Sequence, residues 1–341
     1  MIENLFIFFE EHYFSFLGTF LYGVIGFFIV IKLFPEMGLL DFPERYKLKR
    51  KKIPYPAGLM IFITFIGSLS YFFSPSEVQF EKFSGFLLGL FLLVIVSFID
   101  DRKNISPIIR LCTQALSAGI VIYSGIWIEF LGNPFSDEAF HLSPLLGGAI
   151  TFVWILGFIN TSNWLDGVPN LILGSGIISS FTLGVLSLSP FVQQEETAML
   201  CFLFGFALLP FLLGNLGKTR FILGDTGAMM IGFCLAVFSL FFGGKMATIL
   251  IVMAIPIFDG VYVIMSRIKN KKSPLKGGDG KHLHDILLRK NWKNFQIFLL
   301  YITISTLLGI SVLFLETLEK IILLSVFSGI FLGMRIWLDK K

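Results

Sequence analysis

Long runs of apolar residues, separated by short polar stretches, make up almost the whole of this 341-residue chain. Each run is close to the ~20 residues that a helix needs to cross the hydrocarbon core of a bilayer. Gly, Ser and Thr inside several runs would let such helices pack closely in lipid. The runs predict eleven membrane-spanning helices, at about 12–34, 56–74, 83–99, 108–131, 143–159, 167–189, 197–216, 226–244, 246–266, 294–315 and 317–338.

Composition excludes an ordinary soluble protein. The chain is 55% hydrophobic and 15% charged, with a mean hydropathy of +0.82, whereas soluble domains carry about 25% charged residues. A single aqueous core cannot bury so much apolar surface, so the bilayer must act as its solvent. We therefore predict an all-α polytopic membrane protein that forms one domain over residues 1–341.

The basic residues predict the orientation of the chain. The polar stretches after runs 1, 3, 5, 7 and 9, together with the C-terminus, hold nearly all of the 27 Lys and Arg residues, and the opposite set holds only Lys82, Lys245 and Lys320. Basic loops stay on the cytoplasmic side. The N-terminus is therefore predicted outside and the C-terminus inside. Because the basic residues are confined to these short stretches, the net charge of +4 does not indicate a nucleic-acid binder.

The first two inner loops carry the first polar side chains of interest. The loop over 38–59 contains a basic run that ends at Lys52 and is followed by Pro54 and Pro56. It fits either a phosphate-binding loop or a basic run that binds lipid headgroups. The next loop opens with Asp100 and Asp101 at the end of a span. Neighbouring carboxylates there are costly unless a cation or a proton joins them, and oxygen ligands suit Mg²⁺.

That acidic pair also has a purely structural interpretation. The two aspartates could simply end one helix, with Asn104 and Ser106 capping the helix that follows. Both interpretations remain open from the residues alone.

The third and fourth inner loops add five polar side chains. Asn160, Asn163 and Asp166 are spaced by three, which puts them on one helical face, either as site residues or as a polar packing seam. Asn215 lies ten residues before Asp225, which stands in the turn GDTG at the start of a span. Asp225 could be a metal ligand, with close approach allowed by glycine, or a helix cap.

The fifth inner loop contains two of the four histidines. His282 and His284, beside Asp279 and Asp285, could donate hydrogen bonds to a diphosphate. A zinc site would need further spaced ligands that the loop lacks. Asp259 lies within the ninth run, where an acid is either a functional group or a structural partner for a neighbouring helix.

Taken in order, these motifs resemble a known superfamily. DDRKN, NTSNWLDG, the Asn215…GDTG stretch and KHLH follow the order found in the polyprenyl-phosphate N-acetylhexosamine-1-phosphate transferases, over roughly residues 38–290. No single motif is specific, but the ordered set on alternate loops of one face is. Eleven spans with an outward N-terminus look like the branch that initiates O-antigen and teichoic-acid chains.

The resemblance implies an activity and its requirements. The chain would transfer a sugar-1-phosphate, N-acetylhexosamine-1-phosphate in the family, from a UDP-sugar to undecaprenyl or another polyprenyl phosphate, release UMP and start a cell-envelope glycan. It implies Mg²⁺, or Mn²⁺ in its place, cytoplasmic loops that form the active site, and a bacterial inner membrane. The implied partners are the lipid acceptor and the nucleotide sugar, with a homodimer left open.

The resemblance also implies roles for individual residues. Asp225 matches the principal metal ligand. The implied catalytic residues are Asp100, Asp101, Asp166, His282 and His284, and the implied substrate-binding residues are Lys52, Asn160, Asn163 and Asn215.

The chain departs from the family pattern at several positions. Pro169 and Asn170 replace an aspartate and a glycine, Ile222 stands where a phenylalanine is usual, with Phe221 beside it, and Asp285 replaces a third histidine. Positions 169 and 222 border the nucleobase pocket in the family. The resemblance therefore extends to the metal and diphosphate machinery, and does not identify the nucleotide or the sugar.

Two other classes of function are compatible with parts of the sequence. A catalytically degenerate protein that binds polyprenyl phosphate would explain Pro169 and Asp285. A secondary transporter would use Asp259 and the acidic pair as a proton path, but it predicts charges near the midplane and an internal repeat, whereas the polar groups gather at one interface.

Overall fold

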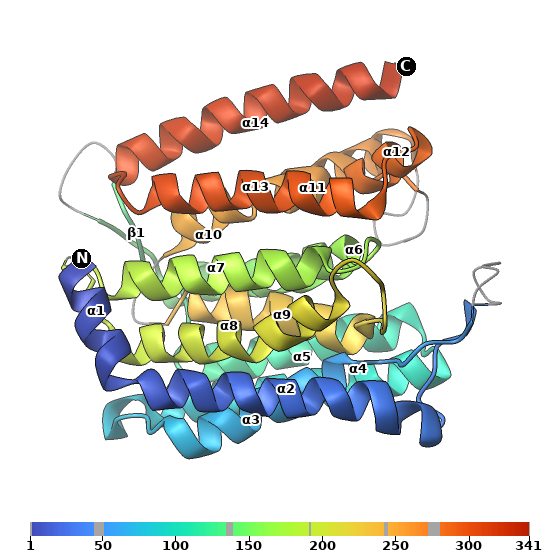
Figure 1. The fold of residues 1–341 in the computed structure, drawn as a ribbon. Helices are drawn as coiled ribbons and strands as arrows, with labels where there is room; N and C mark the ends of the chain where they lie inside the picture. Colours follow the sequence, from blue (N-terminus) through green and yellow to red (C-terminus); the bar gives the residue numbers. More distant parts are fainter. Residues whose placement is uncertain are drawn as a thin grey trace.

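The computed structural model describes residues 2–43, 51–133, 139–190, 192–241, 245–271 and 280–340. Helices dominate it, and one short strand pair joins α5 to α6 (Figure 1). The elements are α1 Ile2–Glu11, α2 Tyr13–Glu36, α3 Gly58–Phe72, the 3₁₀ turn η2 Glu77–Gln79, α4 Phe80–Lys103, α5 Pro107–Tyr123, β1 Phe130–Leu131, β2 Phe140–His141, α6 Pro144–Leu165, α7 Leu171–Ser187, α8 Glu195–Asn215, α9 Gly224–Phe238, α10 Met246–Val252, α11 Ala254–Lys269, α12 Leu283–Arg289, α13 Asn294–Val312 and α14 Thr317–Lys340.

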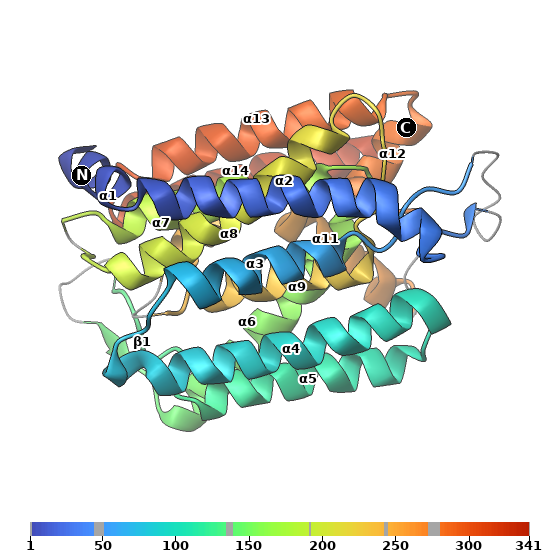
Figure 2. The same cartoon turned by 60° about the horizontal axis from the view of Figure 1, so that its bottom comes forward.

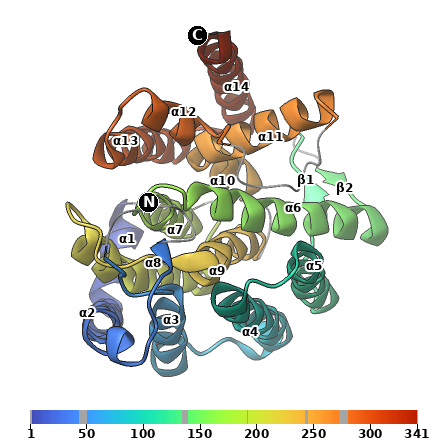
Figure 3. The ribbon, with the colours of Figure 1, turned by 90° about the vertical axis from the view of Figure 1, so that its right-hand side faces the viewer.

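The long helices lie side by side, so the loops gather at two ends of one bundle (Figures 1 and 2). Helix α9 occupies the middle of the bundle when it is viewed end-on, and contacts α3, α4, α6, α7 and α8 (Figure 3). Every residue from Thr226 to Phe238 is buried, which explains why the run is apolar on all sides. The position of α9 therefore depends on five neighbours.

The outer surface of the bundle is strongly apolar. Large side chains such as Phe14, Tyr123 and Leu145 are more than three-quarters exposed. Of the helices that the structure describes, six are long and apolar enough to cross a membrane, and the α10–α11 pair, bent by 84°, would make a seventh crossing. Hydrocarbon is the solvent that such a surface requires. The chain is a multi-pass helical membrane protein.

Each of the eleven predicted runs overlaps a helix. Four of these helices, α3, α5, α7 and α9, have only 15 or 17 residues, so the count of eleven crossings stays a prediction. The run over 108–131 was predicted too long, because α5 ends at Tyr123 and the chain continues to β1. The helical fold class is confirmed, and the strand pair is an addition that the pattern did not predict.

The run over 246–266 is broken into two helices at Met253. Pro256 lies in the first turn of α11, where its missing N–H costs no intrahelical bond. In one continuous helix its ring would clash with the carbonyl of Val252. The proline therefore accounts for the break that the apolar pattern concealed.

Close contact between α3 and α9 gives a test of the packing. A Cβ added to Gly58 would lie 2.2 Å from the backbone nitrogen of Gly227, whereas a Cβ on Gly67 of the same helix meets nothing within 4 Å. We expect Gly58→Ala to lower the free energy of unfolding by about 1–3 kcal/mol through overpacking. Thermal unfolding of the purified protein in detergent measures this. Gly67→Ala is the control, and equal stability of the two variants would contradict the packing.

Candidate functional site

The carboxylate of Asp101, at the end of α4, caps the N-terminus of α9. Its Oδ1 accepts a hydrogen bond from the backbone nitrogen of Asp225 (2.9 Å), and its Oδ2 accepts from the backbone nitrogen (3.0 Å) and the hydroxyl of Thr226. The hydroxyl of Tyr55 donates to Oδ1 over 2.6 Å. The first N–H groups of a helix lack partners within the helix and favour a negative charge. This tertiary contact therefore supplies the cap that the local sequence of α9 lacks.

Gly224 makes this contact possible. Its φ of +82° is strained for residues with a side chain, and a Cβ there would lie 2.7 Å from Oδ2 of Asp101. The backbone before it pairs with the first inner loop, because Ile222 donates to the carbonyl of Pro54 and accepts from Ala57. The GDTG turn is thus held between the first inner loop and the end of α4.

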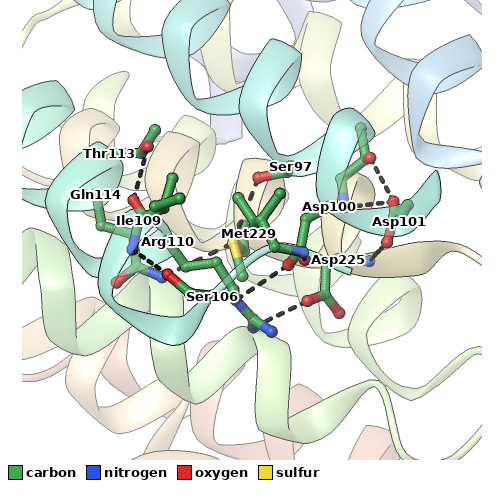
Figure 4. A network of polar contacts seen from close by, with 12 residues as sticks. Ser97, Asp100, Asp101, Ser106, Ile109, Arg110, Thr113, Gln114, Asp225 and Met229 are labelled. Carbon is green, nitrogen blue, oxygen red and sulfur yellow. Dashed lines mark hydrogen bonds and ion pairs between the residues drawn. The ribbon is translucent and has the colours of Figure 1, made fainter. Parts of the chain in front are cut away.

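Asp225 itself faces a cation that the sequence analysis missed. Arg110 in α5 places Nη2 2.8 Å from Oδ2 of Asp225 and Nε 3.2 Å from Oδ2 of Asp100 (Figure 4). In the amide orientation that satisfies both neighbours, Asn163 donates to Asp225 over 3.0 Å and accepts from Arg110 over 2.9 Å. A signal was present, because the Ser106 cap predicts the start of α5 and so places Arg110 in its first turn. The carboxylate of Asp225 therefore faces Arg110 and Asn163 and does not cap α9.

The adjacent acids Asp100 and Asp101 point in different directions. Asp100 turns toward α5, where its Oδ1 accepts from the backbone nitrogen of Ile105 over 2.8 Å, and Asp101 turns toward α9. Ser106 caps α5 as expected, accepting from Ile109. The expectation that Asn104 also caps α5 is wrong, because Asn104 ends α4 in the left-handed region, at φ 57°. Each acid thus has its own hydrogen-bond partners.

The three polar residues of the third loop take different positions. Asn160 donates to the side chain of Gln114 in α5 over 2.8 Å, as a packing seam would. Asn163 reaches Asp225, and Asp166 follows the last residue of α6. Burial, followed by the charges of Asp225 and Asp101, raises the pKa of Asp166 well above its ordinary value, while a hydrogen bond from the backbone of Gly224 opposes this. Asp166 therefore belongs with Asp100, Asp101 and Asp225 to one acidic cluster. Asn163 contacts this cluster through Asp225, and Asn160 lies beside it.

Asn215 organises the loop that leads to α9. Its Oδ1 accepts from the backbone nitrogen of Arg220 (2.6 Å), and its Nδ2 donates to Oδ1 of Asn170 (2.7 Å). Asn170 donates in return to the carbonyl of Asn215, and its own φ is 70°. Asparagine tolerates this conformation better than most residues. Asn170 can therefore stand where the family has glycine.

Phe221 does not replace the usual phenylalanine at position 222. Its side chain is 1% exposed and packs in the core against Phe27 and Phe211. Ile222 takes part in the backbone pairing with the first loop. No aromatic ring from this pair faces the site.

The last loop joins the site through two histidines. The rings of His282 and His284 are nearly parallel, with centroids 5.6 Å apart. Nδ1 of His282 lies 2.8 Å from Oδ2 of Asp259, whose Oδ1 accepts from the backbone nitrogen of Leu283 (2.9 Å) and lies 3.4 Å from Nε of Arg335. Asp259 is therefore the structural partner that one of the two interpretations predicted. Arg335 was missed, because nothing in its sequence neighbourhood points to α11.

Asp285 has a structural role in this loop. Its carboxylate accepts from the backbone nitrogen of His282 over 3.2 Å, and together they form a capping box at the start of α12. Burial lowers the pKa of His284, and the nearby Asp285 partly opposes that shift. A Cβ on Gly167 would lie 2.6 Å from Nε2 of His284, so the third and fifth loops are in contact.

Lys52 stands in the first inner loop, three residues before Tyr55. Its Nζ lies 5.7 Å from the centre of the Phe42 ring. The rest of the basic run over 44–50, and Asp279, lie outside the described residues. Within the described ranges, no group of three His, Cys, Asp or Glu side chains is arranged as a metal site.

The chain is similar to known proteins. Residues 83–243 match the family model described as glycosyl transferase family 4. The chain is 26% identical over 296 residues to a probable undecaprenyl-phosphate N-acetylglucosaminyl 1-phosphate transferase of Bacillus subtilis (strain 168), covering 85% of this chain and 80% of the relative. It is 28% identical over 302 residues to an undecaprenyl-phosphate alpha-N-acetylglucosaminyl 1-phosphate transferase of Yersinia pestis, with 85% and 80% covered.

The hydrogen bond from Tyr55 to Asp101 can be tested by removing one oxygen. Hydrogen bonds to charged groups contribute about 1.5–3 kcal/mol, so we expect Tyr55→Phe to lower the free energy of unfolding by roughly that amount. Tyr71 in α3 is 76% exposed, and Tyr71→Phe is the matched control. Thermal unfolding in detergent compares the two. A Tyr55→Phe protein as stable as the control would show that the cap of α9 does not need the tyrosine.

The lowered pKa of His284 predicts a pH dependence of stability. Between that pKa and the ordinary value of 6.5, the unfolded chain binds a proton that the folded protein does not. The free energy of unfolding therefore falls as the pH falls through this window. We expect His284→Asn to lose less stability than the wild type between about pH 7 and pH 5. His141→Asn, at an exposed position, should behave like the wild type, and a His284→Asn profile identical to both would refute this account.

Proposed function

Residues 83–243 of this chain belong to glycosyl transferase family 4, and from this premise we propose that the chain is a phosphoglycosyl transferase. It transfers N-acetylhexosamine-1-phosphate from a UDP-sugar to undecaprenyl or a related polyprenyl phosphate, and releases UMP. The observation that carries the proposal is the acidic cluster at one end of the bundle, where Asp100 and Asp225 flank Arg110. The names of the relatives support the choice of acceptor and sugar.

The topology that suits this function has eleven crossings with an outward N-terminus. Four shorter apolar helices and the bent pair would join the six long helices. The distribution of Lys and Arg supports a cytoplasmic location for the loops that carry the acidic cluster. The donor would arrive from that side, and the acceptor would reach the same end from the bilayer. A bacterial inner membrane fits both requirements.

The residues at the centre fit a magnesium ion. Mg²⁺ prefers carboxylate oxygens and is commonly held by one or two of them, with waters and substrate phosphates completing its shell. Asp225 would hold it, with Asp100 or Asp166 nearby. When bound, the ion supplies neutralisation of charge on the diphosphate.

The side chains of the site would orient the two phosphate substrates and stabilise the negative charge on their oxygens. An oxygen of the acceptor phosphate bonds to the β-phosphorus of the donor, while the bond from that phosphorus to the bridging oxygen breaks and UMP leaves. Transfer of this kind depends mainly on orientation and on stabilising phosphate charge. Arg110, Lys52 and the His282–His284 pair offer donors for this purpose. Asp101, whose oxygens are engaged by α9 and Tyr55, acts as a positioning residue.

The acceptor does not need a strong general base. A phosphate monoester has a second pKa near 6, so it is mostly ionised at neutral pH. An essential base role for Asp100 or Asp101 is therefore not required by the chemistry. Asp100 is better placed to orient Arg110, its partner at 3.2 Å.

The proposal is tested by an assay with a panel of donors. The purified protein is mixed with polyprenyl phosphate and a series of UDP-sugars, with and without Mg²⁺, and UMP and the lipid product are measured by mass spectrometry. Mg²⁺-dependent UMP release with one sugar would identify the donor. No product from folded protein with any nucleotide sugar would favour the degenerate lipid-binding protein instead.

The metal assignment predicts the effect of one substitution. Asp225→Asn keeps the shape of the side chain and leaves the backbone N–H that donates to Asp101 in place. It removes only the negative charge. We expect the rate to fall more than tenfold, a loss above ~1.4 kcal/mol in transition-state stabilisation. Glu81→Gln, at an exposed position in the first turn of α4, is the control. A folded Asp225→Asn enzyme that kept more than about a tenth of the wild-type rate would rule out this role.

A further inference from the structure

A polar cavity opens between α11, α12 and α14, at the end of the bundle that also carries the acidic cluster. Its volume is about 320 Å³. Figure 1 shows α12 and the C-terminal end of α14 at this end of the molecule. The residues that line the cavity are Tyr262, Val263, Ser266, Lys281, Ile286, Arg289 and Arg335. None of them belongs to the acidic cluster around Asp225.

The cavity carries a positive charge. Three of its lining residues, Lys281, Arg289 and Arg335, are cations, and none of the described lining residues is a carboxylate. The carboxylate of Asp259 lies 3.4 Å from Nε of Arg335, but it is shared with His282 and with the backbone nitrogen of Leu283. Like charges close together at a membrane boundary are costly. Three cations that line one cavity therefore favour an anionic ligand.

The two guanidinium groups are already held in place. Arg335 is 1% exposed, its guanidinium lies 4.6 Å from the centre of the Tyr262 ring, and its Nη2 donates to the carbonyl of Lys281 over 2.7 Å. Arg289 donates to the carbonyl of Gly280. A guanidinium carries five donors in a planar fork that matches phosphate oxygens. Groups fixed before binding lose less conformational entropy when a ligand arrives.

We propose that this cavity binds a phosphate group, and that the phosphate belongs to the headgroup of an anionic phospholipid. Basic pockets between membrane helices at the cytoplasmic surface bind such headgroups. Helix α14 supports this source, because the structure leaves most of its apolar surface exposed, including Ile330 (68%) and Trp337 (54%). A lipid lying along α14 would bring its headgroup to the level of Arg335. The site is separate from the proposed reaction and does not depend on it.

Binding of defined lipids to the full-length protein tests the proposal. Short-chain phosphatidylglycerol and phosphatidylcholine are titrated in neutral detergent and followed by native mass spectrometry, and inorganic phosphate is added at constant ionic strength as a competitor. We expect phosphatidylglycerol to bind in preference to phosphatidylcholine. Arg289→Gln should weaken its binding at least about tenfold, because it removes a charged donor.

Two further variants keep the test decisive. Lys269→Gln removes an exposed cation from α11 outside the cavity and should bind like the wild type. Ser266→Ala removes only a hydroxyl from the lining and should weaken binding several-fold even if Arg289→Gln does not fold. Phosphate that displaces the lipid from the wild type, and does so less well from Arg289→Gln, would show that free phosphate shares the site. Equal affinity in all variants, or no preference for phosphatidylglycerol, would overturn the proposal.

Discussion

The hydrogen bonds from the start of α9 to the carboxylate of Asp101 are the contact on which the rest of this structure depends. Helix α9 lies in the middle of the bundle, and its own N-terminus has no side-chain cap. Asp101 supplies that cap from α4, and Tyr55 secures it from the first loop. Because uncapped N–H groups at a membrane boundary are costly, the same bonds that complete α9 also dock α4 and the first loop against it.

This arrangement places charged groups where the proposed chemistry needs them. Once Asp101 is committed to α9, its neighbour Asp100 is left to face Arg110, and Arg110 in turn holds Asp225. Four carboxylates, those of Asp100, Asp101, Asp166 and Asp225, gather near one end of the bundle. The N-terminus of α9, the guanidinium of Arg110 and the amide of Asn163 offset their repulsion. A substrate with several phosphate oxygens would exchange these internal partners for its own, and a divalent cation would rebalance the charge.

Residues that depart from the family pattern form hydrogen bonds within the loops around the acidic cluster. Asn170 occupies a left-handed backbone position and exchanges hydrogen bonds with Asn215, which glycine could not do. Asp285 caps α12 and lies 3.6 Å from Nε2 of His284. These residues stabilise the loops that shape the site, so their identity can change while the acidic cluster stays in place.

The apolar runs alone predicted where the long apolar helices lie, because the bilayer imposes on each such segment a length and a polarity that are visible in the local sequence. The ordered motifs also indicated that Asp100, Asp101, Asn163, Asp166 and Asp225 would meet, since alternate loops of a bundle share one end. The sequence could not reveal that the two adjacent acids diverge, that Arg110 lies between Asp100 and Asp225, or that Arg335 reaches Asp259 across 76 positions. These contacts depend on which helices become neighbours and how each is rotated. That choice is made by packing among all the helices together, and only the tertiary structure shows it.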